Sequence, residues 1–189
     1  MSDEARENDH EPGEEVPVSG LVDDDVAAAL CERFPGCVFH RSNGQPVVYA
    51  AKDALAEIGS WLRDDQQFTM CVDVTAVDHL TSAGRALPGG VIAERFEVVV
   101  NFLSHVRNRR IRVICEVPAT ETKVPSLTPV YPGADFAERE VFDLMGITFD
   151  GHPALTRILM PDDWEGHPLR KDFPTARVPV TFKGDPSPR

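Results

Sequence analysis

The chain of 189 residues contains no long apolar run. Its most apolar stretch, residues 96–103, is far shorter than the roughly 18 residues that a membrane-spanning helix needs. The N-terminus also lacks the basic start and the apolar segment of a signal peptide. These absences predict a cytosolic protein, or one that is docked on a cytosolic surface.

Cysteine is scarce and has no metal-binding spacing. The four cysteines, Cys31, Cys37, Cys71 and Cys115, are separated by 6, 34 and 44 residues, and none lies in a Cys-x-x-Cys pair or beside a histidine. Iron-sulfur and zinc sites need clustered ligands, so we expect neither here. In a reducing compartment the thiols stay free, and Cys71 and Cys115 are expected to be small core residues.

Phosphate-binding glycine loops are missing as well. Neither G-x-G-x-x-G nor G-x-x-x-x-G-K-[ST] occurs, so the sequence offers no evident binding site for NADH or flavin. Glu138, Glu140, Asp143, His152 and His167 could act as general acids and bases in a free-standing enzyme. The favoured interpretation is structural: Glu138 and Asp143 pair with nearby arginines, while the histidines cap turns.

Charge is unevenly distributed along the chain. The formal net charge is -12, and the first 25 residues hold ten acidic residues against the single base Arg6. Such a segment has too few apolar residues to offset its chain entropy, so we expect residues 1–20 to be a disordered acidic tail. It indicates little about the partners of the folded part.

One basic cluster brackets an expected hairpin turn. Arg107, Arg109, Arg110 and Arg112 have no aromatic residue between them, and the last two alternate with Ile111 and Val113 as on an outward strand face. A solvated or protein-facing strand is therefore favoured over phosphate binding, and no nucleic acid partner is expected.

Hydrophobic periodicity predicts two helices and five strands before residue 118. The helices are expected at 22–34 and 53–62, the second capped by Asp53, and Asn43-Gly44 is a strong hairpin signal. The strands are expected at 38–41, 46–51, 68–77, 95–106 and 110–117. We predict an α+β domain over residues 21–149, with two layers and an open mixed sheet of about five strands that has helices on one face.

A further helix is predicted over residues 134–145 and belongs to this domain. Asp135, Arg139 and Asp143 are spaced to form a charge ladder, and Gly146 suits a left-handed cap. Beyond His152 the chain has seven prolines, which exclude long helices and central strands. Residues 150–189 are therefore predicted to form an extended docking arm.

Two parts of this arm have the composition of an interface. Trp164 lies in a polar stretch and could anchor in a partner's pocket or pack on its own domain. Residues 169–173 alternate charge with Leu169 and Phe173, and an interface is favoured over a soluble tail. The triplets Gly151-His152-Pro153 and Gly166-His167-Pro168 are interpreted as turn devices that direct the arm.

The segment from Glu138 to Pro174 closely resembles the signature of the C subunit of proton-pumping NADH:quinone oxidoreductase, respiratory complex I. The matching elements are Glu138-Arg139-Glu140, Asp143, Gly146-Ile147, Gly151-His152-Pro153, Arg157-Ile158-Leu159, Asp163-Trp164 and Pro168-Leu169-Arg170-Lys171-Asp172. The resemblance covers roughly residues 20–178. Phe136, near a position where the family usually has tryptophan, and Thr156, at an often basic position, depart from it.

The resemblance implies a scaffold with no cofactor of its own, in a peripheral arm whose other subunits hold flavin and iron-sulfur clusters. The complex would pass electrons from NADH to quinone and translocate protons, with this chain supporting the D subunit and neighbouring iron-sulfur subunits on the cytoplasmic face of the membrane. The isolated chain is expected to be inactive. The residues expected at the partner interface are Glu138, Arg139, Glu140, Asp143, His152, Arg157, Asp163, Trp164, His167, Leu169, Arg170, Lys171, Asp172 and Phe173.

Two alternatives remain open besides a free-standing enzyme. The chain could be the equivalent subunit of a related membrane complex whose electron donor is ferredoxin, coenzyme F420 or hydrogen, because the donor is bound by other subunits. It could also be an adaptor outside respiration.

Overall fold

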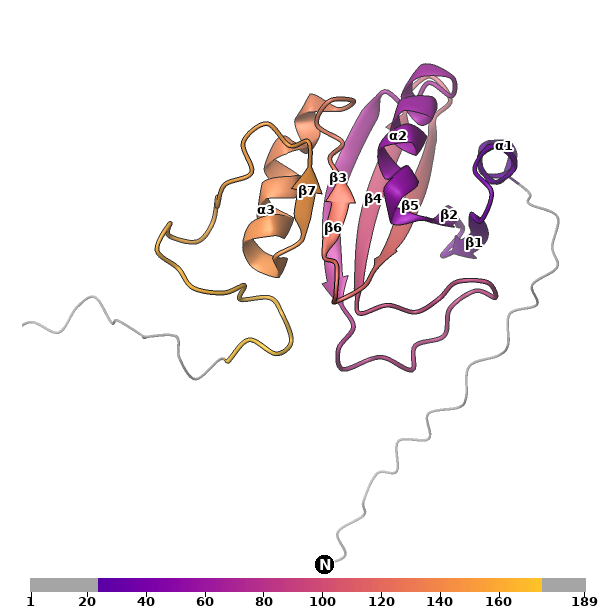
Figure 1. Ribbon diagram of the computed structural model, residues 1–189. Helices are drawn as coiled ribbons and strands as arrows, with labels where there is room; N and C mark the ends of the chain where they lie inside the picture. The colour runs from indigo at the N-terminus through magenta and orange to yellow at the C-terminus, as the bar shows by residue number, and fades with distance from the viewer. Residues whose placement is uncertain (1–23, 175–189) are drawn as a thin grey trace, which may run out of the picture.

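The computed structural model describes residues 24–174. A five-stranded sheet forms the centre of the molecule, with strand order β1-β2-β5-β4-β3 (Figure 1). Its strands are β1 (Val38–Ser42), β2 (Gln45–Ala50), β3 (Met70–Asp78), β4 (Phe96–Ser104) and β5 (Arg109–Val117). Only the β2–β5 pair is parallel, so the sheet is mixed, as predicted.

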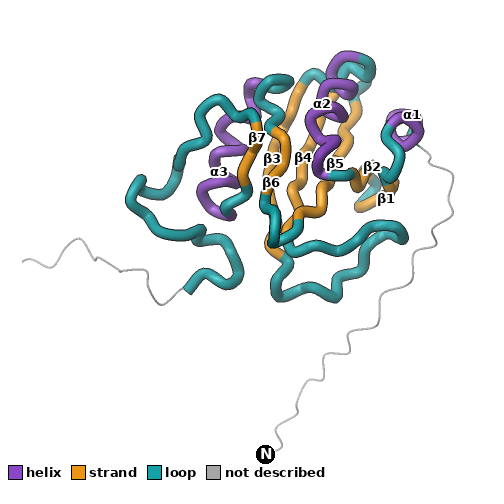
Figure 2. The backbone as a smooth tube through the Cα atoms, in the orientation of Figure 1, coloured by secondary structure: helices purple, strands orange, loops and turns teal. Residues whose placement is uncertain are grey.

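Three α-helices accompany this sheet: α1 (Asp25–Arg33), α2 (Leu55–Asp64) and α3 (Asp135–Met145). Single 3-10 turns precede two of them, η1 (Lys52–Ala54) before α2 and η2 (Pro132–Ala134) before α3. A small parallel ribbon of β6 (Lys123–Pro125) and β7 (Thr148–Asp150) lies between α2 and α3 (Figures 1 and 2). The predicted α+β architecture is confirmed.

All three helices bury their apolar sides in one core. Leu30 of α1, Leu62 of α2 and Val141 of α3 belong to the same hydrophobic cluster as Val100 of β4 and Val113 of β5. Along β4 and β5 every second residue points into this cluster, as the two-residue period of a strand requires. The helices therefore cover one face of the sheet.

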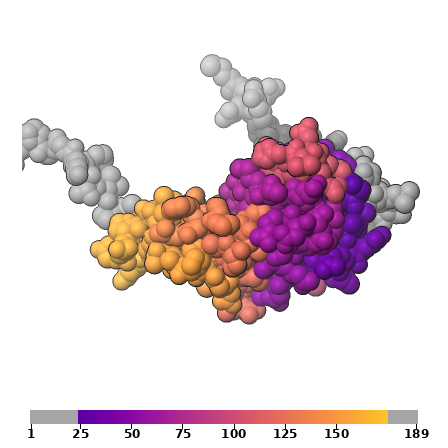
Figure 3. Space-filling view, turned by 90° about the horizontal axis from the view of Figure 1, so that it is seen from above, coloured from indigo at the N-terminus to yellow at the C-terminus, as the bar shows by residue number. Residues whose placement is uncertain are grey.

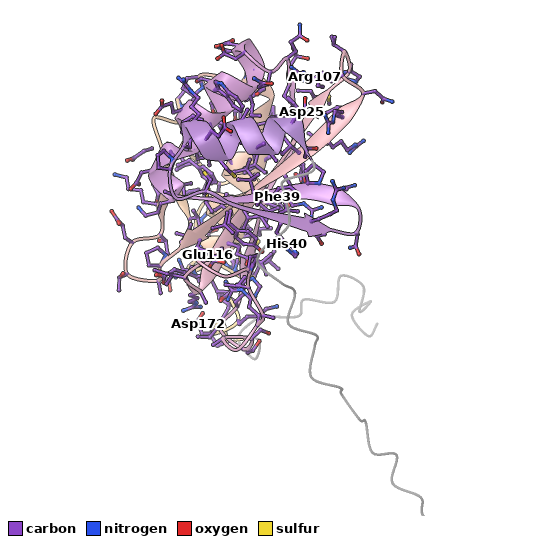
Figure 4. The ribbon with its side chains drawn as sticks, turned by 90° about the vertical axis from the view of Figure 1, so that its right-hand side faces the viewer. Asp25, Phe39, His40, Arg107, Glu116 and Asp172 are labelled. Atoms are coloured by element: carbon purple, nitrogen blue, oxygen red, sulfur yellow. The ribbon has the colours of Figure 1, made fainter. Side chains whose placement is uncertain are left out.

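The opposite face of the sheet carries charged side chains and is partly covered by the long connection between β3 and β4. Arg85 of this connection donates to Glu97 at 3.2 Å and to Glu116 at 2.7 Å, two residues that face each other on β4 and β5. Glu116 is close to the end of β5 and lies in the lower half of the molecule in Figure 4. Near the β3 edge, Met70 and Val77 are exposed.

Two local predictions need correction and one lies outside the described residues. Asp53 does not cap α2, because it lies inside η1 and pairs with Lys52 at 3.2 Å. The first helix begins at Asp25 and is capped by Asp24, which accepts hydrogen bonds from the amides of Val26 and Ala27. The predicted disordered tail, residues 1–20, is not among the described residues.

The part of the predicted arm that the structure describes, residues 151–174, is irregular but does not extend away from the domain. It folds back along α3 (Figure 2), where the Leu169 amide donates to the Leu144 carbonyl at 3.0 Å. The expectation of an extended arm is therefore corrected for these residues. Residues 175–189 are not described.

Candidate partner interface

The predicted interface is built on α3 and on the loop that follows β7, residues 151–174. The helix ends at Gly146, whose φ of 71° is left-handed, as the sequence predicted. A Cβ at this position would lie 2.5 Å from the His167 ring and 2.7 Å from the Arg170 guanidinium. Glycine is therefore required twice, for the backbone conformation and for the close approach of the loop.

Glu138 on α3 is fully buried and holds the chain segment that precedes the helix. Its carboxylate accepts from the Leu127 amide at 2.6 Å, from the Ser126 hydroxyl at 2.6 Å and from the Thr128 hydroxyl at 3.2 Å. Burial raises the pKa of Glu138, and these hydrogen bonds only partly oppose the effect. No arginine among the described residues pairs with it, so the expected Glu138–arginine pair is wrong, and the side chain does not reach the surface.

Asp143 is the centre of a buried clamp. One oxygen accepts from three successive amides, those of Ile158 (3.0 Å), Leu159 (2.8 Å) and Met160 (2.8 Å), and the other accepts from Arg157 at 2.5 Å. Burial alone would raise the pKa of Asp143, but these donors outweigh it and hold the pKa at about 2. The loop is thus tied to the helix by a charge-assisted network.

Arg139 and Arg157 complete the attachment of the loop. Arg139 donates to the Thr156 carbonyl and to the Arg157 carbonyl at 3.2 and 3.1 Å, whereas Arg157 donates to Asp143 and to the Gly166 carbonyl. Arg139 bonds the loop instead of Asp135 or Asp143, so the predicted charge ladder along α3 is wrong. The physical reason is that carbonyls of an irregular loop have no regular partners and need donors, which Arg139 supplies.

Both histidines of the repeated triplets bond backbone, as predicted. The Ala154 amide donates to Nδ1 of His152 at 3.1 Å, which leaves Nε2–H to donate to the Asp135 carbonyl at 3.3 Å. His167 donates from Nδ1 to the Asp143 carbonyl at 2.9 Å and packs edge-on against Phe142. Each histidine thereby pins one end of the loop to α3.

Arg170 satisfies the C-terminal carbonyls of α3. Its guanidinium donates to the Met145 carbonyl at 2.6 Å and to the Gly146 carbonyl at 3.2 Å, and it lies 5.3 Å from the centre of the Phe96 ring. A cation at the C-terminal end of a helix is favoured by the helix dipole. The Arg170 guanidinium therefore donates its hydrogen bonds within the chain.

The loop reaches the sheet at the end of β3. Arg95 pairs with Asp78 at 2.8 Å and with Asp172 at 2.8 Å, and the Lys171 amide donates to Asp78 at 2.9 Å. Burial would raise the pKa of Asp78. Hydrogen bonds from Arg95 and from the amides of Lys171 and Leu80 outweigh burial and lower this pKa to about 2. Asp172 lies at the lower end of the sheet in Figure 4.

Trp164 and Phe173 stack on each other within the loop. Their ring centroids are 6.2 Å apart with an interplanar angle of 23°, and both residues are half-buried. The indole N–H of Trp164 is buried without a hydrogen-bond partner in residues 24–174. The loop therefore has an aromatic pair of its own, and Trp164 is not displayed as a free anchor.

The outward side of this assembly combines large apolar side chains with charged ones. Phe136 is 66% exposed, Leu159 59% and Leu169 51%. Glu140, Asp163 and the ammonium group of Lys171 are also exposed and form no ion pair within the described part of the chain. In Figure 3 the loop, coloured orange to yellow, forms a lobe on one side of the molecule.

The fourteen predicted interface residues thus separate into two groups. Most of them, including Glu138 and Asp143, are used internally to shape the loop, while Glu140, Asp163, Leu169 and Lys171 present side chains outward. Phe136 and Leu159 were not predicted as interface residues, although large apolar side chains in a polar, proline-rich neighbourhood were a usable signal. Asp78 and Arg95 were missed because their partners in the loop lie more than 75 residues away in the sequence.

Within residues 24–174 no group of three or more histidine, cysteine or acidic residues is arranged to hold a metal ion. All four cysteines are free, and burial raises the pKa of the Cys115 thiol to about 12. The described helices are all too short or too polar to cross a membrane. The expected absence of a cofactor in this chain stays a prediction.

Comparison with solved structures supports the fold. A trypsin-resistant fragment (1-134) of Nqo5 superposes with a TM-score of 0.59 at 28% identity, covering 69% of this chain and 96% of the fragment. A chain of the membrane-bound sulfane sulfur reductase, an archaeal respiratory membrane complex, has a TM-score of 0.63 over 85% of this chain and 95% of its own. Its identity is 20%, so this likeness concerns the fold alone.

Sequence comparison extends the likeness over most of the chain. The C subunit of NADH-quinone oxidoreductase from a Nocardioides species is 42% identical over 188 residues, which cover 94% of this chain and 71% of the relative. The protein of the same name from Saccharopolyspora erythraea is 46% identical, covering 75% of this chain and 54% of its own length. The model of the respiratory-chain NADH dehydrogenase 30 Kd subunit matches residues 48–179. This chain therefore belongs to the family of the respiratory-chain NADH dehydrogenase 30 Kd subunit.

Proposed function

We propose that this chain is a non-catalytic structural subunit in the peripheral arm of a proton-translocating NADH:quinone oxidoreductase. It supports the D subunit and neighbouring iron-sulfur subunits on the cytoplasmic face of the membrane, and flavin and iron-sulfur clusters belong to its partners. Membership of the 30 Kd subunit family supports this proposal. The isolated chain is expected to have no activity.

The observation that carries the structural role is the use of the signature residues. Asp143, Arg157 and Arg170 direct their charged groups to backbone groups and to each other, and none is left poised toward a cavity. Their joint effect is to hold an irregular loop in one conformation. Such a loop has no repeating hydrogen bonds of its own, so its shape depends on these side chains.

The surface that results is suited to a permanent protein partner. Three large apolar side chains, Phe136, Leu159 and Leu169, are more than half exposed on α3 and its loop. The backbone that carries Leu159 is fixed by hydrogen bonds to Asp143, so less conformational entropy is lost on binding than for an unstructured segment. We assign this surface as the docking site for the D subunit.

The test is the double variant Leu159→Asp with Leu169→Asp, expressed in cells that assemble the complex. Recovery of the other subunits with the tagged chain under mild detergent should fall at least about tenfold, since loss of two central apolar contacts costs more than about 1.4 kcal/mol. Ile92→Asp is the matched control, because Ile92 is 78% exposed on the connection between β3 and β4.

Both leucines are exposed, so the thermal midpoint of the isolated variant should match that of the wild type. Unchanged recovery of partners by the double variant would contradict the docking surface. Stoichiometric flavin or iron in the purified wild-type chain, or NADH oxidation by that chain alone, would contradict the non-catalytic role.

A further inference from the structure

Strand β3 exposes apolar side chains on the face of the sheet that points away from the helices. Val74 and Ala76 are buried on the helix side, so the residues that alternate with them point to the opposite side, as the two-residue period of a strand requires. Val77 is one of these residues and is exposed. A solvated face of an antiparallel pair normally carries polar residues, so an exposed apolar side chain here needs an explanation.

A β-bulge enlarges this apolar surface at the other end of β3. Cys71 packs against the core, so Met70 and Val72, on either side of it, point to the opposite face. The register with β4 shifts between Cys71 and Asp73, and as a result Val72 and Asp73 are both exposed. We define the β3 strip as Met70, Val72, Asp73 and Val77.

The described part of the chain leaves the β3 strip uncovered. The connection between β3 and β4 reaches the same face of the sheet, but Arg85 and the Glu94 amide bind it to Glu97 and Glu116, which belong to β4 and β5. Within residues 24–174, β3 is the edge strand of the sheet, on the side of α3 (Figure 1). Edge strands with exposed apolar side chains tend to associate with other chains, so the strip is suited to a protein partner.

The charge of the strip indicates the chemistry of that partner. Asp73 is exposed and forms no ion pair within residues 24–174. In the same row of the sheet, Arg112 on β5 donates to Asn101 at 3.1 Å, and Asn101 lies between Arg112 and Asp73. A carboxylate among apolar side chains loses its hydration when a partner covers it, and this loss is costly unless the partner supplies a cation.

The same charge disfavours two other occupants. A second copy of this chain would bring a second acidic strip and a second net charge of -12, and both oppose association. An anionic membrane surface would be repelled for the same reason. A basic protein segment is the occupant that matches both the apolar side chains and the carboxylate.

We propose that the β3 strip binds a basic segment of another subunit of the complex. Apolar side chains of this segment cover Met70, Val72 and Val77, and a lysine or arginine of the segment pairs with Asp73. Because β3 is held in a regular sheet, its backbone loses little conformational entropy on binding.

The strip is separate from the docking surface on α3 and its loop. Its side chains point away from the helix side of the sheet, whereas α3 belongs to that side through Val141 in the core. The proposal rests on the proposed function, since the partner is a subunit of the same complex. It adds a second contact surface and the sign of the charge that this surface binds.

The first arm of the test is site-specific crosslinking in the complex purified under mild detergent. A photoreactive amino acid replaces Val77, and in separate chains it replaces Leu159 on the docking surface or Val106, which is exposed in the turn between β4 and β5. Mass spectrometry identifies the linked peptides. We expect position 77 to be linked to a peptide of another subunit that contains lysine or arginine, with a yield at least about fivefold above that of position 106.

Charge variants of Asp73 form the second arm. Asp73→Lys should lower the yield of the position 77 product at least about tenfold, Asp73→Asn should lower it less, and Asp73→Glu should preserve it. Glu57→Lys, which reverses an exposed carboxylate on α2, is the matched control and should have no effect. The thermal midpoints of the isolated Asp73 variants should match that of the wild type, because this side chain is exposed.

The outcomes separate this proposal from the proposed function. Linkage of position 77 to a second copy of this chain or to lipid, or equal yields from Asp73→Lys and the wild type, would overturn the role of the strip. If position 159 is linked to a partner subunit and position 77 to none, the strip is wrong and the proposed function stands. If the chain purifies without other subunits, both proposals fail.

Discussion

The pKa values of two carboxylates on one helix are shifted in opposite directions by their surroundings. Asp143 accepts from three amides and from Arg157, so its ionised form is stabilised. Glu138 is equally buried but accepts only from an amide and two neutral hydroxyls, and burial raises its pKa. Burial is the main cause of the raised pKa of Glu138, whereas three amides and the Arg157 cation outweigh burial at Asp143.

Replacing Asp143 by asparagine should destabilise the chain by about 3 kcal/mol, because it leaves Arg157 without its charged partner in a buried site. The pKa of Asp143 is depressed in the folded state, so its contribution is fully present above the unfolded pKa of about 3.9 and is lost as the pH falls toward about 2. Chemical denaturation at pH 7 and at pH 3 measures both effects. Asp163→Asn, at an exposed position, should change the stability by less than about 0.5 kcal/mol.

Glu138→Gln should show the opposite pH trend. The pKa of Glu138 is raised in the folded state, so the wild type is favoured below the unfolded pKa of about 4.3 and loses this contribution as the pH rises. The variant keeps a neutral acceptor for the Leu127 amide and should gain stability relative to the wild type between about pH 4 and 7. Parallel pH profiles of the two proteins would contradict this assignment.

Three separate segments of the chain form hydrogen bonds with helix α3. Glu138 holds the segment that precedes the helix, Asp143 holds residues 158–160, and the end of the helix receives Arg170. Gly146 makes the last of these contacts accessible, because His167 and Arg170 pack where a side chain would start.

Gly146→Ala should therefore destabilise the chain by more than about 1–2 kcal/mol, which is the cost of a left-handed conformation alone, with the contact to His167 adding to it. Gly133→Ala is a suitable control. No atom lies within 4 Å of the position that its Cβ would take, and the φ of Gly133 is not left-handed. Thermal unfolding of the two variants makes the comparison. Equal midpoints would contradict the role given to the cap.

At the scale of the whole molecule, Arg95 and Asp78 join the loop to the sheet. Arg95, in front of β4, binds Asp78 of β3 and Asp172 of the loop, 77 residues further along the chain. Regular hydrogen bonding links the strands but does not reach the loop. The attachment of the end of the loop to the sheet thus depends on a few charged contacts. The end of the loop can therefore detach without unfolding of the sheet.

Arg95→Leu should release residues 170–174 while the sheet stays folded. Tryptic cleavage at Lys171 should become at least about tenfold faster, which corresponds to about 1.4 kcal/mol of lost local stability. Mass spectrometry of timed digests measures the rate, and Arg33→Leu on α1 serves as the control at an exposed arginine. Equal cleavage rates in the three proteins would show that other contacts hold the loop.

The sequence alone determined the elements and their class. The apolar periods of β4 and β5, the Asn43-Gly44 turn and the Gly146 cap are local signals, so helices, strands and the mixed α+β layout could be predicted from them. The signature from Glu138 to Pro174 was sufficient to indicate the family. These features depend on neighbours within a few residues.

Only the tertiary structure decided how the signature is used. Arg139 donates to the Thr156 carbonyl instead of forming the expected charge ladder. Asp143 accepts from the amides of residues 158–160, and the Lys171 amide donates to Asp78, which lies 93 residues away in the sequence. An irregular loop has no period from which its path can be predicted, and its backbone groups take whichever donors and acceptors the fold brings near. For that reason the predicted extended arm proved to be a loop held against α3, with Arg157 and Arg170 directed inward and Leu159 and Leu169 outward.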